Sequence, residues 1–287
     1  MATVNREYKD RLFSFIYGSA ENKEWTLDLY NAVNGTDYTD PSEINITTIR
    51  EVLYLGMRND VSFIITDEMS LYEQQSTYCP NMPLRLLQYS GNLYEKYITE
   101  RKLNKFGSTL LQLPAPRLVV FYNGPQELDD EVILRLSDSF PEGAKSDIEV
   151  SVRMININRG RSLRLMSECR TLKEYSWLIA EIRDNLKAME IDNAVDKAIM
   201  EMPDDYTLKP FLKAHQQEVK DMLMTEYNEA EAMELFKEDG RKEGREDERF
   251  INIKSLIETL NLTPDQAMDA LKVPSESRYK YIIRLGK

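Results

Sequence analysis

Residues 59–75 have the sequence NDVSFIITDEMSLYEQQ, in which two β-prone runs flank a short acidic break. The first run, 61–66, is rich in β-branched and aromatic residues, and the second, 70–75, contains Leu71 and Tyr72. Such runs are typical of strands, and a two-residue separation is typical of a β-hairpin. The stretch therefore predicts an antiparallel hairpin that turns at Asp67-Glu68.

The turn position sets which residues face one another. With Asp67-Glu68 as the two-residue turn, Thr66 pairs with Met69, and Asp60 lies opposite Gln75. Because side chains alternate between the two faces of a strand, Asp60, Glu73 and Gln75 are expected on one face. The other face is expected to carry Val61, Phe63, Ile65 and Tyr72.

Two carboxylates and an amide on one face suggest a metal site. Asp60 and Glu73 would lie close enough for their oxygens to share one cation. Oxygen ligands of this kind suit Mg²⁺, or Mn²⁺ in its place, and a water activated at the ion could attack a phosphodiester. Gln75 would orient that water or donate to the phosphate, and the backbone carbonyl of Gln74 is a further candidate ligand.

The pattern along the rest of the chain predicts an α/β fold with a mixed sheet. Apolar residues recur at helical spacing near the N-terminus and again from 21 to 33. Strands are expected at 44–49, 51–56, 117–122 and 148–157, and a long helix is expected after Asn81. From Leu172 onward the pattern is almost wholly helical.

Three regions are expected along the chain: a main α/β region at 1–190, a charged helical connection at 191–249, and a small three-helix tail at 250–287. Gly240 and Gly244 leave two interpretations of the charged stretch 226–249, a solvated helix or a hinge. The tail resembles either a helix-turn-helix or, as we favour, a docking or dimerisation module. A homodimer through this tail is suggested by apolar residues that have little obvious core of their own: Ile251, Ile253, Leu256, Ile257 and Leu260.

Composition excludes several classes of protein. The formal net charge is −12, which argues against a protein that coats nucleic acid electrostatically. No run of about 18 apolar residues occurs, and the polar N-terminus does not match a secretion signal. We therefore expect a soluble, cytoplasmic protein with no membrane segment. Cys79 and Cys169 are expected to be free thiols, and His215 is the only histidine, so a cluster of imidazole ligands is excluded.

One basic segment, 151–187, lies between two acidic ones. It includes Arg159, Arg161 and Arg164, which we expect to contact the phosphates of a nucleic acid. The alternative is an ordinary solvated positive face.

Four runs resemble those of bacterial PD-(D/E)XK transposase-like nucleases, also called recombination-promoting nucleases. They are Lys9-Asp10-Arg11-Leu12-Phe13, Leu71-Tyr72-Glu73-Gln74-Gln75-Ser76-Thr77, Pro80-Asn81-Met82-Pro83-Leu84-Arg85 and Val119-Val120-Phe121-Tyr122-Asn123-Gly124. The resemblance covers roughly residues 5–190 and keeps the order and approximate separation of the runs.

The resemblance implies a restriction-endonuclease-like fold, with a mixed central sheet flanked by helices and Mg²⁺ as the ion. Asp60 and Glu73 match the two acidic ligands of the family motif, and Gln75 stands where the superfamily more often has lysine. Asp10 matches an acidic residue of the first helix that would complete the metal shell through water. Arg85 would reach a phosphate, although anchoring the start of its helix is equally consistent with its position.

These observations together predict a Mg²⁺-dependent DNA endonuclease that acts in bacterial recombination or mobile-element biology. A different class of function stays open. The acidic charge and the absent lysine favour a binding protein that keeps the nuclease-like scaffold within a regulatory or defence complex. Cleavage of RNA would use the same chemistry, but no residue pattern here indicates recognition of a 2′-hydroxyl.

Overall fold

The computed structural model describes residues 12–47 and 60–286. Asp10 and the strand expected at 51–56 lie outside the described residues. The chain divides into two compact units, residues 1–225 and 226–287. Helix α8 (Gln216–Leu260) begins in the first unit and ends in the second.

Within the described residues, six strands in the order β1-β2-β3-β4-β6-β5 form the sheet at the centre of the first unit. The strands are β1 (Asn45–Ile46), β2 (Val61–Ile65), β3 (Glu68–Gln75), β4 (Ala115–Tyr122), β5 (Glu131–Arg135) and β6 (Ser151–Asn156). Strands β3, β4 and β6 run parallel, whereas β1 and β2 at one edge and β5 at the other are antiparallel to their neighbours. The expected α/β class with a mixed sheet is confirmed. Edge strand β5 was not expected, because it lies in a segment punctuated by proline and glycine.

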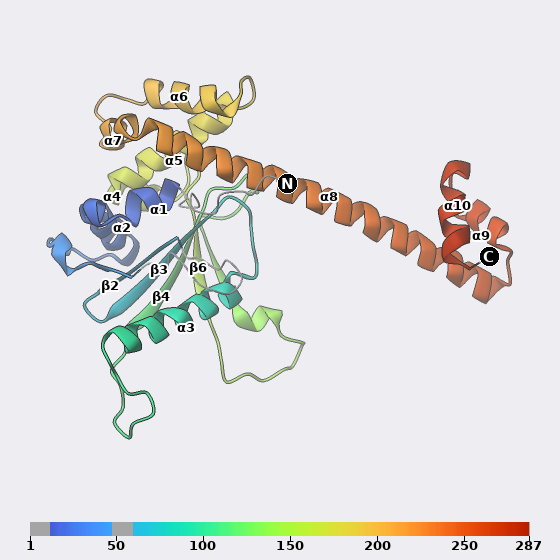
Figure 1. The fold of residues 1–287 in the computed structure, drawn as a ribbon, viewed down its shortest axis with the longest axis horizontal. Coiled ribbons are helices and arrows are strands. Elements are labelled where there is room, and N and C mark those ends of the chain that lie inside the picture. The colour runs from blue at the N-terminus through green and yellow to red at the C-terminus, as the bar shows by residue number, and fades with distance from the viewer. Residues whose placement is uncertain (1–11, 48–59, 287) are drawn as a thin grey trace. The chain divides into compact units, whose positions relative to one another are not determined.

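Helices cover both faces of this sheet (Figure 1). The helices of the first unit are α1 (Leu12–Tyr17), α2 (Lys23–Asn34), α3 (Met82–Glu100), α4 (Leu163–Glu168), α5 (Arg170–Asn185), α6 (Ile191–Glu201) and α7 (Leu208–Ala214). Helix α3 packs on one face through Leu86 and Leu93, and α1, α2, α4 and α5 pack on the other. The core on the second face continues beyond residue 190, the expected end of the main region, to Leu212 and Leu223.

Helices cover both faces of strand β3, so the polar side chains of this strand lie in the interior of the fold. Seven of its eight residues, 69–75, are buried. A strand buried on both faces is normally apolar throughout. Here its last three residues, Glu73, Gln74 and Gln75, are polar, so each must find a partner within the fold.

The second unit has a small core of its own. The end of α8 packs against α9 (Pro264–Ala270) and α10 (Ser275–Arg284), with Ile253, Met268 and Tyr281 buried between them. A capping box, in which Thr263 and Gln266 bond each other's backbone N–H groups, starts α9. Ile253, Leu256 and Ile257 therefore have a core of their own, contrary to the expectation, whereas Ile251 and Leu260 are exposed.

The charged stretch 226–249 belongs to α8, which continues through Gly240 and Gly244 without a break. The secondary structure of the stretch is thus helical, as in the first of the two interpretations. Among the described residues, no helix has both the length and the apolar character needed to cross a bilayer.

Candidate active site

The β2–β3 hairpin brings the two acidic residues together, but in a different register from the expected one. Ile65 pairs with Glu68, so the turn is formed by Thr66 and Asp67, one residue earlier than predicted. Thr66 adopts the left-handed conformation, with φ 51°, that tight hairpin turns require. The pairing of Thr66 with Met69, and of Asp60 with Gln75, is therefore wrong.

Moving the turn by one residue shifts every pair by two, which leaves the faces unchanged. Val61, Phe63 and Tyr72 lie in the core on the α1 side, as expected. Glu73 lies on the α3 side, because its neighbours in register, Val120 and Met154, belong to the core under α3. The ladder, extended by one residue, sets Asp60 opposite Glu73.

Backbone N–H groups bind the two carboxylates. The N–H of Asp60 donates to Glu73 Oε1 at 3.1 Å, and the N–H of Gln74 donates to Asp60 Oδ2 at 2.7 Å. Glu73 is 1% exposed and Asp60 is 9% exposed. Hydrogen bonds from N–H groups stabilise negative charge on buried side chains such as these two.

Gln75 lies two residues after Glu73 on the same face and is 7% exposed. Its Nε2 is a buried donor for which the structure shows no hydrogen-bond partner. Leaving a buried donor unsatisfied costs about 1–3 kcal/mol. A buried amide of this kind beside two carboxylates is suited to an oxygen acceptor of a ligand.

Gln74 points to the other side of the sheet, where its Nε2 donates to Asn123 Oδ1 at 2.7 Å. In an extended strand the N–H and C=O of one residue point to the same side. Because the Gln74 N–H reaches Asp60, the Gln74 carbonyl also faces the Asp60 side of β3. This orientation is the one expected of a backbone ligand beside the carboxylates.

A supporting network that sequence reasoning missed fixes this end of the sheet. Arg183 on α5 donates to the carbonyl of Asn123 and, at 3.2 Å, to Asn158 Oδ1. Asn158 in turn donates to the carbonyl of Gly124 at 3.0 Å. The Asn123-Gly124 pair directly after a buried strand was a signal for a constrained loop, whereas nothing in the spacing marked Arg183.

Arg85, in the first turn of α3, lies against the acid pair. Its Nη2 is 3.6 Å from Glu73 Oε2 and 3.2 Å from the Tyr89 hydroxyl, to which it donates. Its Nη1 contacts the sulfur of Met82 at 3.4 Å, which supports the alternative that Arg85 anchors the start of the helix. The side chain is 34% exposed.

The three arginines of the basic segment follow β6 at the same end of the strands as Glu73 and Gln75, but Arg159 and Arg164 contact or lie on α5 and α4, which cover the opposite face of the sheet from Glu73. Strands β3, β4 and β6 are parallel, and Gln75, Tyr122 and Asn156 are neighbours in register. Each arginine has an acidic neighbour in the structure. The pairs are Arg159–Glu181 at 2.5 Å, Arg161–Asp130 at 3.9 Å and Arg164–Glu168 at 3.8 Å.

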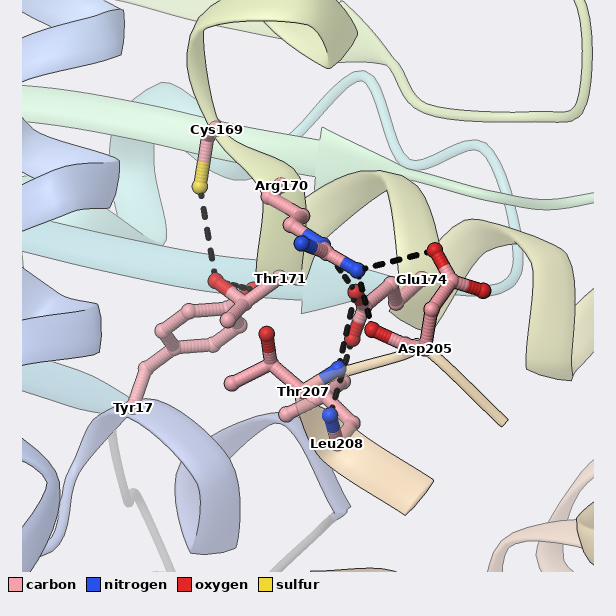
Figure 2. A network of polar contacts seen from close by, with 8 residues as sticks. All are labelled: Tyr17, Cys169, Arg170, Thr171, Glu174, Asp205, Thr207 and Leu208. Atoms are coloured by element: carbon pink, nitrogen blue, oxygen red, sulfur yellow. Dashed lines mark hydrogen bonds and ion pairs between the residues drawn. The ribbon is translucent and has the colours of Figure 1, made fainter. Parts of the chain in front are cut away.

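A second buried polar cluster lies on the other side of the sheet (Figure 2). Glu174 is 1% exposed and accepts hydrogen bonds from Arg170 Nε and from the N–H groups of Thr207 and Leu208. It fixes the start of α7 to α5. Nearby, burial raises the pKa of the Cys169 thiol to about 11, so this thiol stays protonated and is a poor nucleophile.

Among residues 12–47 and 60–286, no group of three or more His, Cys, Asp or Glu side chains is placed to hold a metal ion. Cys79 and Cys169 are both free thiols, as expected.

Comparisons with protein-family models, with curated proteins and with solved structures find no match to this chain.

Proposed function

We propose that this chain is a cytoplasmic, divalent-metal-dependent DNA endonuclease with a restriction-endonuclease-like fold, of the recombination-promoting type that its sequence resembles. The observation that carries the proposal is the meeting of the Asp60 and Glu73 carboxylates beside the unpartnered amide of Gln75. These residues hold the positions at which the resemblance expects two acidic ligands and the third motif residue.

The donor set fits a hard cation. It consists of oxygen atoms alone: two carboxylates and the carbonyl of Gln74. Mg²⁺ is typically held by one or two carboxylates and keeps several waters, so a third acidic side chain is not required, and Mn²⁺ accepts the same ligands. Bound there, the ion would supply Lewis-acid activation and charge neutralisation at a phosphate. Asp10 is the proposed additional carboxylate.

The side chains of the chain itself supply the rest of the mechanism. Asp60 and Glu73 hold the ion, and Gln75 Nε2 donates to the attacking water or to a phosphate oxygen. Because glutamine adds no positive charge, the charge on the phosphate is balanced by the ion and by arginines. Arg159, Arg161 and Arg164, which follow β6 at the same end of the strands, would hold the nucleic-acid backbone.

A binding role without catalysis is the second candidate. The observation that favours it is that Arg85 lies 3.6 Å from Glu73 and partly neutralises a proposed metal ligand. The net charge of −12 has the same implication. In this role the chain would recognise a partner within a regulatory or defence complex.

Plasmid nicking with Mg²⁺ tests catalysis. The isosteric substitutions Asp60→Asn and Glu73→Gln remove one negative charge each and retain the side-chain shape. We expect each to reduce the nicking rate by about 100-fold or more, the range found when one group that stabilises a transition state is lost.

Asp67→Asn is the matched control, because Asp67 is an exposed acid in the turn of the same hairpin. It should nick at the rate of the unmodified chain. Nicking that persists in both site variants would disprove the active site. If the folded, unmodified chain nicks neither DNA nor RNA and does not bind Mn²⁺, the nuclease proposal fails and the binding role is the remaining candidate.

A further inference from the structure

The charge balance of the site carries an inference about its regulation. Glu73 is buried to 1% exposure, and one of its oxygens, Oε1, already accepts the N–H of Asp60. The other oxygen, Oε2, lies 3.6 Å from Arg85 Nη2. A buried carboxylate is costly unless an opposite charge compensates it, and the guanidinium of Arg85 supplies such a charge.

Three features of the contact between Arg85 and Glu73 would favour its release. At 3.6 Å it is an ion pair rather than a charge-assisted hydrogen bond, which would measure about 2.7–2.9 Å. The same Nη2 donates to the Tyr89 hydroxyl at 3.2 Å, so Arg85 keeps a hydrogen bond when it leaves Glu73. The side chain is 34% exposed, so it is not enclosed by the core.

A divalent cation held by Asp60 and Glu73 would lie next to the guanidinium, and the two positive charges would repel each other. We propose that Arg85 is the resident counter-ion of Glu73, that it competes with a divalent cation for this carboxylate, and that cation binding releases it. The inference rests on the proposed metal site and adds a regulatory element to it. The released guanidinium is then available to a backbone phosphate, which couples cation binding to substrate binding.

Titration of the full chain with Mn²⁺ at about pH 8 tests the competition. The electron paramagnetic resonance signal of the free ion shows how much Mn²⁺ is bound. Arg85→Gln removes the competing charge, and its dissociation constant for Mn²⁺ should be about tenfold lower than that of the unmodified chain, equivalent to about 1.4 kcal/mol. Arg85→Lys keeps the charge and should bind Mn²⁺ as the unmodified chain does.

Arg117→Gln is the matched control. Arg117 pairs with Glu68 at the other end of β3, at 2.6 Å, so this variant removes the same charge from an arginine–glutamate pair that lies away from the site. Its Mn²⁺ affinity should not change. If Arg85→Gln binds Mn²⁺ no tighter than Arg117→Gln does, Arg85 is not a competitor, and the metal site stands without it. If neither the unmodified chain nor Arg85→Gln binds Mn²⁺, the metal-dependent function fails as well.

A measurement on the unmodified chain covers the case in which Arg85→Gln does not fold. In a nitrogen–proton correlation spectrum, the Nε–H resonance of Arg85, assigned by its absence in Arg85→Lys, should shift as Mg²⁺ saturates the site. The resonance of Arg117 should stay in place. An Arg85 resonance that does not move while Mg²⁺ binds would overturn the displacement.

Discussion

At the scale of single residues, two buried polar groups define the candidate site. Glu73 combines near-complete burial with an arginine at 3.6 Å, and Gln75 combines burial with an amide that has no partner. The ion pairs of the basic segment, unlike the pair of Glu73 and Arg85, lie on the surface. Exposed ion pairs contribute about 0–1 kcal/mol, so the acidic neighbours of Arg159, Arg161 and Arg164 would hinder phosphate binding only slightly.

Replacing Arg159, Arg161 and Arg164 together by glutamine should weaken binding to duplex DNA and flatten its salt dependence. Each phosphate that the protein no longer neutralises reduces the slope of log K against log[salt] by about 0.9. Fluorescence anisotropy with a labelled duplex over a series of salt concentrations measures both quantities.

The control for this triple variant removes three positive charges at the opposite end of the strands. Arg101, Lys102 and Lys105 are exposed in the loop before β4, whose first residue is bonded to the β2–β3 turn. Their replacement by glutamine should leave the slope nearly as it is. Equal slopes for both triple variants would remove the basic segment from the binding surface.

At the scale of elements, the fold depends on polar groups that join helices across the core. Glu174 on α5 accepts the N–H of Leu208, the first residue of α7, at 2.8 Å. Orphan N–H groups at a helix start need such acceptors, and a carboxylate there also interacts favourably with the helix dipole. The same side chain binds Arg170, so one buried acid fixes both elements (Figure 2).

Glu174→Gln should lower the free energy of unfolding of the first unit by about 2–4 kcal/mol, because a buried charged acceptor of three N–H groups becomes a neutral one. Urea denaturation followed by tryptophan fluorescence reports the change, since Trp177 lies on α5 and Trp25 on α2.

Glu168→Gln is the corresponding control, because Glu168 is a half-exposed acid that pairs with Arg164 at 3.8 Å on one short helix. Its effect should stay within about 0.5 kcal/mol. Similar decreases in the two variants would mean that Glu174 does not anchor α7.

At the scale of the whole molecule, the chain is built from two units with separate cores. The second unit buries Ile253 in its own core but leaves other apolar side chains on its surface. Ile251 is 63% exposed, Leu260 is 60% exposed and Ile283 is 57% exposed. We propose that these side chains, rather than Ile253, mediate homodimerisation through the tail.

The double variant Ile251→Lys and Ile283→Lys should therefore convert a dimer into a monomer of 33.5 kDa while the tail stays folded. Light scattering coupled to size exclusion measures the mass, and circular dichroism checks the helix content. Met200→Lys, at an equally exposed apolar position on α6, should leave the mass of the dimer intact. A monomeric unmodified chain would exclude the dimer altogether.

Local patterns in the sequence were sufficient for much of the architecture. The hairpin, the long helix after Asn81, the strand that ends at Tyr122 and the helices of the tail were all expected. The face on which Glu73 lies was also predictable, because alternation in a strand does not depend on where the turn is placed. The turn itself was placed one residue late, since Thr66 carries none of the usual signals for a left-handed conformation.

The sequence by itself thus determined which side chains share a face, because period-two alternation and hydrophobic patterning are local properties of the chain. Tertiary structure alone decided what those side chains meet. The approach of Arg85 to Glu73, the bond from Arg183 to Asn123 and the burial of Ile253 all join residues on different elements. Such contacts depend on the packing of helices against the sheet, which no local pattern encodes.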